Sequence, residues 1–447
     1  ARYIIRTGCN TPTTRSIGNA PPKPLPGQPQ DMEERCGEYL ARRMGKLGYR
    51  TFGIGKFHPV PEEEDIGYET YMPVKDLYPT PQSREHDSYL KWLMKNHPER
   101  GYIEGLMGER TEMFYVPQLN PLPAEENMEW WAAEQTIEQI NSKDKRPYFG
   151  FVSLFSPHPP FAPPIPFNRM YDPDRMPPPV CGDIATDHMD AMIPDMMHAL
   201  WADDITPTHA KILKARYYGE VSFVDHCLGK ILDAVEARGN ADNTVIAFFT
   251  DHGDHLGDHN AWHIGSYFDT VARIPFFLSW PRRIKPGQRR RELVTLADLF
   301  GIATSAAGKL DAREGADVLG VLEGKAKPRE MVYGHFGMPG RNTFKIMVRE
   351  KRYKYIFLAN GGREQLFDLD TDPNELKNLA GEKPELLKQM RAEAVKACSV
   401  PGAADAIENG DLKSFEFKAP PPRRICQFDK SRGITGFPAN PSDVLRK

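Results

Sequence analysis

The 447-residue chain lacks several features that would assign it to a class at once. No apolar run reaches the roughly 18 residues that a membrane-spanning helix needs. The opening residues, Ala1–Arg6, lack the long apolar segment of a signal peptide, so we expect none within this sequence. A net charge of -3 gives no electrostatic case for nucleic acid. We therefore expect neither a membrane protein nor a nucleic-acid-binding protein.

The common short catalytic motifs and metal motifs are missing as well. The sequence contains no HExxH, no GxSxG and no glycine-rich phosphate loop. Its six cysteines show no CxxC or zinc-ribbon spacing, and they do not settle the redox compartment. Proline, in contrast, is abundant at 41 residues. It concentrates at 20–29, 157–166, 172–179 and 419–422, which indicates long ordered surface loops of the kind that often carry function.

Apolar runs typical of buried strands alternate with helical patterns up to about residue 310. The predicted strands are Arg50–Ile54, Pro147–Phe155, Val245–Thr250 and Arg273–Leu278. The predicted helices are Asp31–Leu47, Glu126–Ile140 and a long helix that starts at Thr206-Pro207, with a proline-rich excursion at 162–206 interpreted as a lid. This alternation predicts an α/β fold with a large, mostly parallel sheet flanked by helices.

The pattern changes beyond about residue 326. Short strands at Phe344–Arg349, Tyr353–Phe357 and Gln365–Leu369 are separated by turns, as in an antiparallel meander, and a helix is predicted over Lys383–Ala397. We therefore divide the chain into a catalytic α/β domain, 1–325, and a smaller C-terminal α+β subdomain, 326–447, with an antiparallel sheet and an extended tail.

Polar side chains follow three of the predicted strands at their carboxyl ends. They are Lys56 and His58, then His158, then Asp251 with His252. In open α/β sheets, ligands bind at this edge of the sheet. Asp and neutral His bind divalent metals, and cationic donors beside them suit the oxyanion of a phosphate or a sulfate. The sequence therefore predicts a metal-assisted oxyanion site at the mouth of the sheet.

A zinc-binding helix is a rival interpretation of the last of these segments. His255, His259 and His263 are spaced i, i+4, i+8, which on a helix would place three ligands on one face. Gly253 and Gly257 interrupt the segment, and a strand precedes it without a helix signal. We therefore favour a loop here.

Several segments together resemble one family. They are Leu47–His58, Ser156–Phe161, Tyr217–Leu232, Thr250–Asp254 with Arg273–Pro275, and Arg352–Tyr355 with Leu366–Ala380. In this order they resemble the type I, formylglycine-dependent sulfatases of the alkaline phosphatase superfamily. The resemblance implies an alkaline phosphatase-like fold, hydrolysis of a sulfate ester, one Ca²⁺ ion, and a periplasmic or secreted location.

The family's nucleophile is a formylglycine made from Cys or Ser in the pattern C-x-P-S/A-R, which Thr-Gly follows a few residues later. Here Ala1–Gly8 resembles the later half of that pattern. The resemblance thus implies that the formylglycine comes from a Cys or Ser upstream of Ala1, together with the first strand and the paired Asp metal ligands. Cys9 lies after the Thr-Gly, so it is not a substitute.

The resemblance also implies a role for each matching residue. Asp251 and His252 would be metal ligands. Arg2 and Lys56 would hold the formylglycine hydroxyls and the sulfate oxygens. His58 would orient or deprotonate the hydrated formylglycine, and His158 would face the sulfate and the leaving oxygen.

One departure from the family concerns the leaving group. Where the family commonly has a Lys two residues after a Trp, this chain has Ile264. The adjacent His263 could supply the missing donor as a protonated imidazole that acts as a general acid, or it could be an ordinary loop residue.

The substrate is predicted to be a sulfated saccharide. Arg423 and Arg424 in the tail could bind an anionic sugar through bidentate contacts, or they could be solvated surface charges. Gly55–Pro59 with Phe268-Asp269 resembles the iduronate-2-sulfatase branch, which implies a sulfated uronate of a glycosaminoglycan-like polysaccharide and a role in polysaccharide degradation. Two alternatives stay open: a phosphonate or phosphate ester hydrolase of the same superfamily, and an inactive sulfatase-fold protein that binds glycans.

Overall fold

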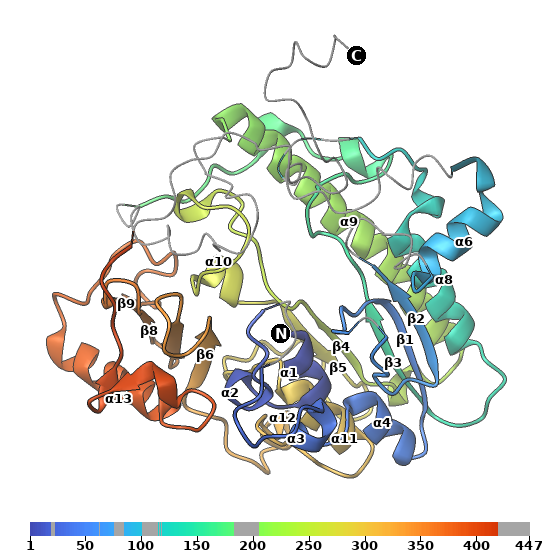
Figure 1. Ribbon diagram of the computed structural model, residues 1–447. Helices are drawn as coiled ribbons and strands as arrows, with labels where there is room; N and C mark the ends of the chain where they lie inside the picture. The colour runs from blue at the N-terminus through green and yellow to red at the C-terminus, as the bar shows by residue number, and fades with distance from the viewer. Residues whose placement is uncertain are drawn as a thin grey trace, which may run out of the picture.

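Figure 1 shows the computed structural model, in which a parallel sheet and an antiparallel sheet lie on either side of the N-terminal helices. The structure describes residues 1–18, 23–61, 63–75, 85–100, 115, 117, 119–182 and 205–418. Arg423 and Arg424 lie outside the described residues, as do residues 183–204 of the predicted lid. In the described part of the chain, no helix combines the length and the apolar character that a membrane span requires.

The parallel sheet has the order β2-β1-β3, with β1 (Arg50–Lys56) between β2 (Thr70–Val74) and β3 (Tyr148–Ser153). Every residue of β1 is buried, as expected for a central strand with an unbroken apolar run. Gly55 has a φ of 104°, and a Cβ there would collide with the carbonyl oxygen of Ser153. Glycine at this position therefore lets β1 and β3 stay paired up to the point where Lys56 leaves the sheet.

The strand that leads to Asp251 lies in a separate antiparallel pair. Its residues form β4 (Ile246–Phe249), which pairs with β5 (Phe276–Ser279). Within the described residues, β3 pairs only with β1, and β4 pairs only with β5. The rings of Phe151 in β3 and Phe249 in β4 contact each other, with centroids 6.0 Å apart. The apolar strands β3, β4 and β5 are at most half-buried, and Phe277 of β5 is 65% exposed.

Two helices cover the parallel sheet, α8 (Met128–Ile140) and the long α9 (Pro207–Ala237). The Thr206 side chain caps α9 by accepting from His209 N, as the Thr-Pro start predicts. Phe223 and Cys227 of α9 pack against the start of α8 in a shared apolar cluster. The predicted helices at these positions are confirmed.

The predicted helix over Asp31–Leu47 is wrong in one respect. It is divided into α3 (Met32–Cys36), capped by Asp31, and α4 (Leu40–Lys46). Gly37 adopts a φ of 82° between them, which ends the first helix and turns the chain. A glycine inside a helical pattern was the available signal.

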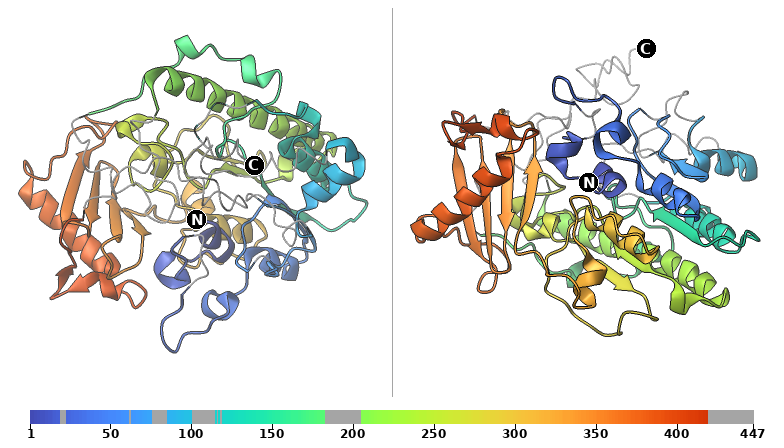
Figure 2. Two further views of the ribbon diagram at one scale, coloured as in Figure 1. Left: turned by 45° about the horizontal axis from the view of Figure 1, so that its top comes forward. Right: turned by 90° about the horizontal axis from the view of Figure 1, so that it is seen from below.

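The C-terminal subdomain is a four-stranded antiparallel sheet of order β6-β7-β8-β9 with one helix on its face. Its elements are β6 (Val332–Phe336), β7 (Lys345–Arg349), β8 (Tyr353–Leu358), β9 (Arg363–Asp368) and α13 (Pro384–Cys398). The predicted meander and helix are confirmed, whereas β6 was not predicted. We retain the boundary at 325/326 as a proposal. Figure 2 shows the antiparallel sheet standing beside the rest of the chain from two further directions.

The remaining elements connect these layers. They are α1 (Arg2–Thr7), α2 (Thr11–Thr14), α6 (Ser88–Asn96), α10 (Asp269–Ala272), α11 (Asp298–Ala306), α12 (Val318–Leu322), β10 (Ile407–Glu408) and β11 (Asp411–Leu412). Short 3₁₀ helices lie at Pro98–Arg100, Ala124–Glu126, Phe167–Arg169, Pro173–Arg175, Ala241–Asn243, Asp258–Asn260 and Ala404–Ala406.

Candidate oxyanion and metal site

The candidate site begins where three chain segments meet around Asp251. Arg2, the first residue of α1, places Nη2 3.4 Å from Asp251 Oδ2. Its other terminal nitrogen, Nη1, lies 3.3 Å from Nδ1 of His58 and donates to it. His58 follows β1 with a φ of 53°. One guanidinium therefore joins the N-terminal helix to the ends of β1 and β4, and the structure brings together three residues that the sequence analysis selected.

Asp251 and His252 lie side by side directly after β4. His252 Nε2 lies 3.7 Å from Asp251 Oδ1. His252 Nδ1 lies 2.9 Å from Gly253 O, so the ring's hydrogen sits on Nδ1 and the Nε2 lone pair faces the carboxylate side. Burial raises the pKa of Asp251, but the positive charges around it, those of Arg2 and Lys56 among them, outweigh burial and hold that pKa well below its usual range.

An ionised carboxylate beside an imidazole lone pair suits a divalent cation. The pair is only part of a ligand set, since the described residues contain no cluster of three or more His, Cys, Asp or Glu that could hold a metal. The residues present therefore fit a cation site that needs further ligands.

His158 and His263 form a second group beside this pair. Their rings meet edge to face, with centroids 6.0 Å apart. His158 Nδ1 lies 2.8 Å from Pro159 O and donates to it, which leaves Nε2 as an acceptor in the neutral ring. Burial, Lys56 and His263 lower the pKa of His158 well below its ordinary value. Lys56 Nζ lies 4.4 Å from the ring centre of Phe155, whose ring also contacts that of His158.

A hydrogen bond from its backbone to Asp254 fixes the position of His263 and its ring. Its φ is 69°, and its backbone N–H donates to Asp254 Oδ1 at 3.1 Å. Asp254 also accepts from the Tyr115 hydroxyl at 2.7 Å. Burial lowers the pKa of His263 to about 4, with Asp254 opposing that change. The imidazole is therefore mainly neutral near pH 7, and its role as the proton donor stays a prediction.

The zinc-helix interpretation is excluded by the backbone, because His255–His263 is not an α-helix. His255 is fully buried and its Nε2 lies 2.8 Å from Ser266 Oγ. His259 stacks on Phe268 with ring centroids 3.9 Å apart. Both of these histidines are packed into the loop that carries His263, as the loop interpretation predicts.

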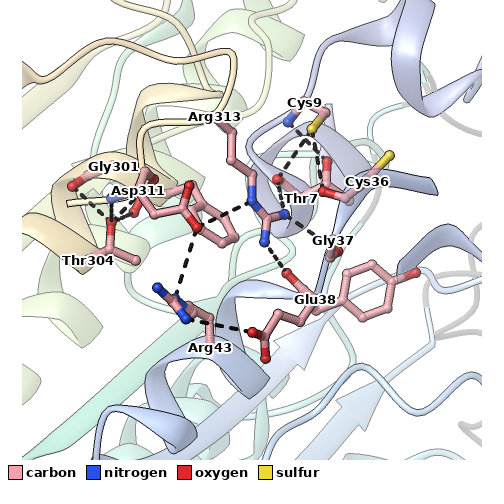
Figure 3. A network of polar contacts seen from close by, with 12 residues as sticks. Thr7, Cys9, Cys36, Gly37, Glu38, Arg43, Gly301, Thr304, Asp311 and Arg313 are labelled. Atoms are coloured by element: carbon pink, nitrogen blue, oxygen red, sulfur yellow. Dashed lines mark hydrogen bonds and ion pairs between the residues drawn. The ribbon is translucent and has the colours of Figure 1, made fainter. Parts of the chain in front are cut away.

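A residue that sequence reasoning missed anchors the helix that carries Arg2. Figure 3 shows the Arg313 guanidinium donating to the carbonyl oxygens of Thr7 and Glu38, the latter at 2.7 Å. The guanidinium carbon of Arg313, Cζ, lies 3.8 Å from the ring centre of Phe300. Arg313 thereby ties the end of α1 to the turn between α3 and α4. No local pattern near residue 313 signals this contact.

Two buried acids beneath the site were also missed. Glu129 of α8 and Glu220 of α9 are 5% and 4% exposed. Glu220 lies on the same face of α9 as Leu213, Phe223 and Cys227, all of which are fully buried. An acid on an otherwise apolar helix face was the sequence signal, because a buried charge needs specific partners.

Comparisons with known proteins match most of the chain. A family model described as Sulfatase matches residues 9–309, and one described as N-sulphoglucosamine sulphohydrolase, C-terminal, matches residues 257–398. An arylsulfatase of Clostridium perfringens is 29% identical over 360 residues, which cover 76% of this chain and 73% of that protein.

Two solved structures share the fold. A phosphonate monoester hydrolase of Agrobacterium radiobacter has a TM-score of 0.70 at 23% identity, covering 88% of this chain and 84% of that one. A protein solved in complex with its substrate D-glucosamine-2-N,6-O-disulfate has a TM-score of 0.66 at 17% identity, covering 90% and 88%. The predicted alkaline phosphatase-like fold is thereby confirmed.

Proposed function

Because this chain belongs to the sulfatase family, we propose that it hydrolyses a sulfate ester on a carbohydrate, with a formylglycine nucleophile and one Ca²⁺ ion. The observation that carries the proposal is the convergence of Arg2, His58, Asp251 and His252 at the ends of β1 and β4. A sulfated uronate of a glycosaminoglycan-like polysaccharide is the proposed substrate, and a periplasmic or secreted location is proposed with it.

Lys56 and Arg2 would hold the negative charge of the sulfate. Lys56 is the last residue of β1 and is 5% exposed, so its charge acts in a region with little water to screen it. Arg2 would present its guanidinium to the oxygens while it keeps Asp251 ionised. Preorganised cations of this kind stabilise the charge that develops in the transition state.

His58 would orient the nucleophile. Because its Nδ1 accepts from Arg2, the hydrogen of the neutral ring is on Nε2, which makes that edge a donor. This arrangement favours the orienting role over the deprotonating role. His158 would face the sulfate and the leaving oxygen.

His263 is the proposed proton donor to the leaving oxygen. Its neutral ring can donate a hydrogen bond, and it transfers a proton only in the fraction that is protonated. Ile264 occupies the position where the family commonly has a Lys, so the neighbouring His263 is the candidate for that task.

Asp251 and His252 would bind the Ca²⁺ ion, which would polarise the sulfate. The further Asp ligands and the formylglycine would come from a segment that precedes Ala1. The half-buried β3 supports this, because a strand of a parallel sheet is normally buried on both faces.

Two observations test the proposal. The reading frame upstream of Ala1 should encode Cys or Ser, any residue and Pro immediately before it; its absence would favour the glycan-binding alternative. The protein with that segment should release sulfate from sulfated uronates, and the His158→Gln variant should be much slower.

A phosphonate or phosphate ester hydrolase remains the second candidate, since a phosphonate monoester hydrolase shares the fold at a TM-score of 0.70. Paired sulfate and phosphate esters of one alcohol separate the two. A higher kcat/KM on the phosphate ester would replace the first proposal by the second.

A further inference from the structure

A buried lysine of the antiparallel sheet reaches the segment just before α10. Lys354, the second residue of β8, is 1% exposed, and three oxygens surround its ammonium group. The ammonium donates to Tyr267 O at 2.8 Å and to Asp269 Oδ1, and it forms an ion pair with Glu375 Oε1 at 2.6 Å. Because a lysine ammonium has three hydrogens and no acceptor, three oxygens match its donor capacity. Lys354 therefore attaches the segment around Asp269 to β8.

Glu375 completes this attachment, because its two oxygens have different partners. Oε1 meets the Lys354 ammonium, and Oε2 accepts from the backbone N–H of Asp269, the first residue of α10. Glu375 is 1% exposed, and Arg349 Nη1 of β7 lies 3.9 Å from the second oxygen of Asp269. Two cations and two carboxylates thus balance in charge, as buried charges require. Together they hold the start of α10 beside the antiparallel sheet (Figure 1).

The other end of α10 supports the turn that follows the proposed metal ligands. Gly253 donates its backbone N–H to Val271 O at 2.8 Å. A Cβ at Gly253 would lie 2.1 Å from Thr270 O, so the backbone of the turn is in close contact with α10. Gly253 O in turn lies 2.9 Å from Nδ1 of His252 and accepts its hydrogen. The position of α10 therefore orients the His252 ring through Gly253.

We propose that Lys354 is a positioning residue: by holding α10, it fixes the Gly253 turn and with it the ring of His252. This role rests on the proposed function, in which His252 is a metal ligand. Lys354 touches neither the cation nor the substrate in this proposal, since it acts through α10. The C-terminal subdomain thereby supports the geometry of the metal site in the catalytic domain.

Hydrogen exchange of the wild type and of Lys354→Met, both without Ca²⁺, tests this support. The substitution leaves two buried carboxylates without their shared cation, so α10 should move and Gly253 should lose its acceptor. We expect the amides of residues 251–256 to exchange about tenfold to hundredfold faster relative to those of β1, which is the effect of losing a charge-assisted hydrogen bond. A lysine that only stabilises the fold would speed exchange in both segments alike.

Ca²⁺ affinity provides a second measurement. Loss of a residue that orients a metal ligand typically weakens metal binding roughly 10–100-fold. The Ca²⁺ concentration that produces half of the rise in Tm should therefore be at least about tenfold higher in Lys354→Met than in the wild type. A merely structural role would lower Tm by the same amount at every Ca²⁺ concentration.

Arg352→Met is the matched control. Arg352 lies two residues before Lys354 and pairs with Asp368 of β9 at 2.6 Å, so the substitution breaks an ion pair within the antiparallel sheet. Exchange of residues 251–256 and the response of Tm to Ca²⁺ should both match the wild type in this variant.

Glu375→Gln is the second variant if Lys354→Met does not fold. An amide has a single oxygen, so it cannot serve both the Lys354 ammonium and the N–H of Asp269 as the carboxylate does. Exchange of residues 251–256 should again rise relative to β1, by a smaller factor.

Two results would overturn the proposal: exchange of residues 251–256 that is unchanged relative to β1 in the variant that folds, or a Ca²⁺ affinity of that variant equal to that of the wild type. A wild type whose Tm does not respond to Ca²⁺ would instead count against the proposed function. Because exchange is measured without Ca²⁺, it would still decide the role of Lys354 in that case.

Discussion

Arg2 and Asp251, which are 249 positions apart in the chain, form an ion pair with 3.4 Å between Nη2 and Oδ2. The pair couples the N-terminal helix to the end of β4. One contact therefore joins Arg2 of the proposed sulfate site to Asp251 of the proposed metal site. Each side chain remains about a quarter exposed, at 24% and 26%. Such a pair contributes only about 0–1 kcal/mol to folding, and its importance lies in the site.

The Arg2→Ala variant should lose sulfate binding with little loss of stability. A charge-assisted hydrogen bond contributes about 1.5–3 kcal/mol, which corresponds to roughly a tenfold to hundredfold weaker Kd. Titration calorimetry with inorganic sulfate measures this. Arg146→Ala, which removes an exposed arginine paired with Glu69 and Asp144, is the control and should bind sulfate normally. Equal affinities in all three proteins would show that Arg2 does not face the anion.

The Asp251→Asn variant should weaken Ca²⁺ binding by at least about tenfold, because a neutral amide replaces a charged ligand. The readout is the increase of Tm with Ca²⁺ concentration, since a ligand that binds only the folded state raises its stability. Asp233→Asn, an exposed position on α9, should respond like the wild type. A Ca²⁺-dependent Tm in Asp251→Asn that matches the wild type would remove this residue from the metal site.

The His263→Ala variant should distinguish between leaving groups. General acid catalysis contributes roughly 10²–10⁴-fold, and it matters most for an unactivated sugar alcohol. We therefore expect a large loss of kcat on a sugar sulfate and a small loss on an activated aryl sulfate. With a pKa of about 4, the protonated fraction falls tenfold per pH unit above that value, so kcat/KM on the sugar sulfate should decline with it. Unchanged turnover of the sugar sulfate in His263→Ala would exclude the donor role.

The Arg313→Ala variant should destabilise the fold by about 2–3 kcal/mol, because it leaves the carbonyl groups of Thr7 and Glu38 without this donor and removes the cation over Phe300. The free energy of urea unfolding measures the effect. Arg290→Ala, an exposed arginine paired with Glu292, should change it by no more than about 0.5 kcal/mol. Similar losses in both variants would contradict the anchoring role.

Lys345 should make the stability of the fold rise with pH above neutrality. Burial lowers the pKa of Lys345 to about 7, and its Nζ lies 3.0 Å from Gly265 O in the loop after His263. Between pH 7 and the unfolded value near 10.4, the unfolded state binds more protons, so stability rises with pH. The Lys345→Met variant should lose this rise, by up to about 1.4 kcal/mol per pH unit. Identical pH profiles of the urea midpoint in the wild type and in Lys345→Met would contradict this prediction.

The sequence predicted those parts of the fold and site that depend on local pattern. The apolar run of β1 and the capping box at Asp31 are such patterns, and so are the polar residues directly after the strands. β2 was missed because Pro73 interrupts it. The strand tolerates proline because, among the residues that the structure describes, it pairs on one side only, with β1.

The contacts made by Arg313 could not be predicted in the same way. They depend on distant partners such as Thr7 and Glu38, whose proximity is set by tertiary packing. The pKa of His263 is a similar case, because the lowering of that pKa follows from burial of the ring in the folded chain.

The half-buried strands also bear on handling of the protein. Phe277 is 65% exposed and Phe248 is 37% exposed, on the paired strands β5 and β4. Open backbone edges next to exposed aromatic rings favour strand-to-strand association between copies of a chain. Produced on its own, this polypeptide should therefore be prone to concentration-dependent self-association, and charged substitutions at Phe277 should improve its solubility more than substitutions on the fully covered β1.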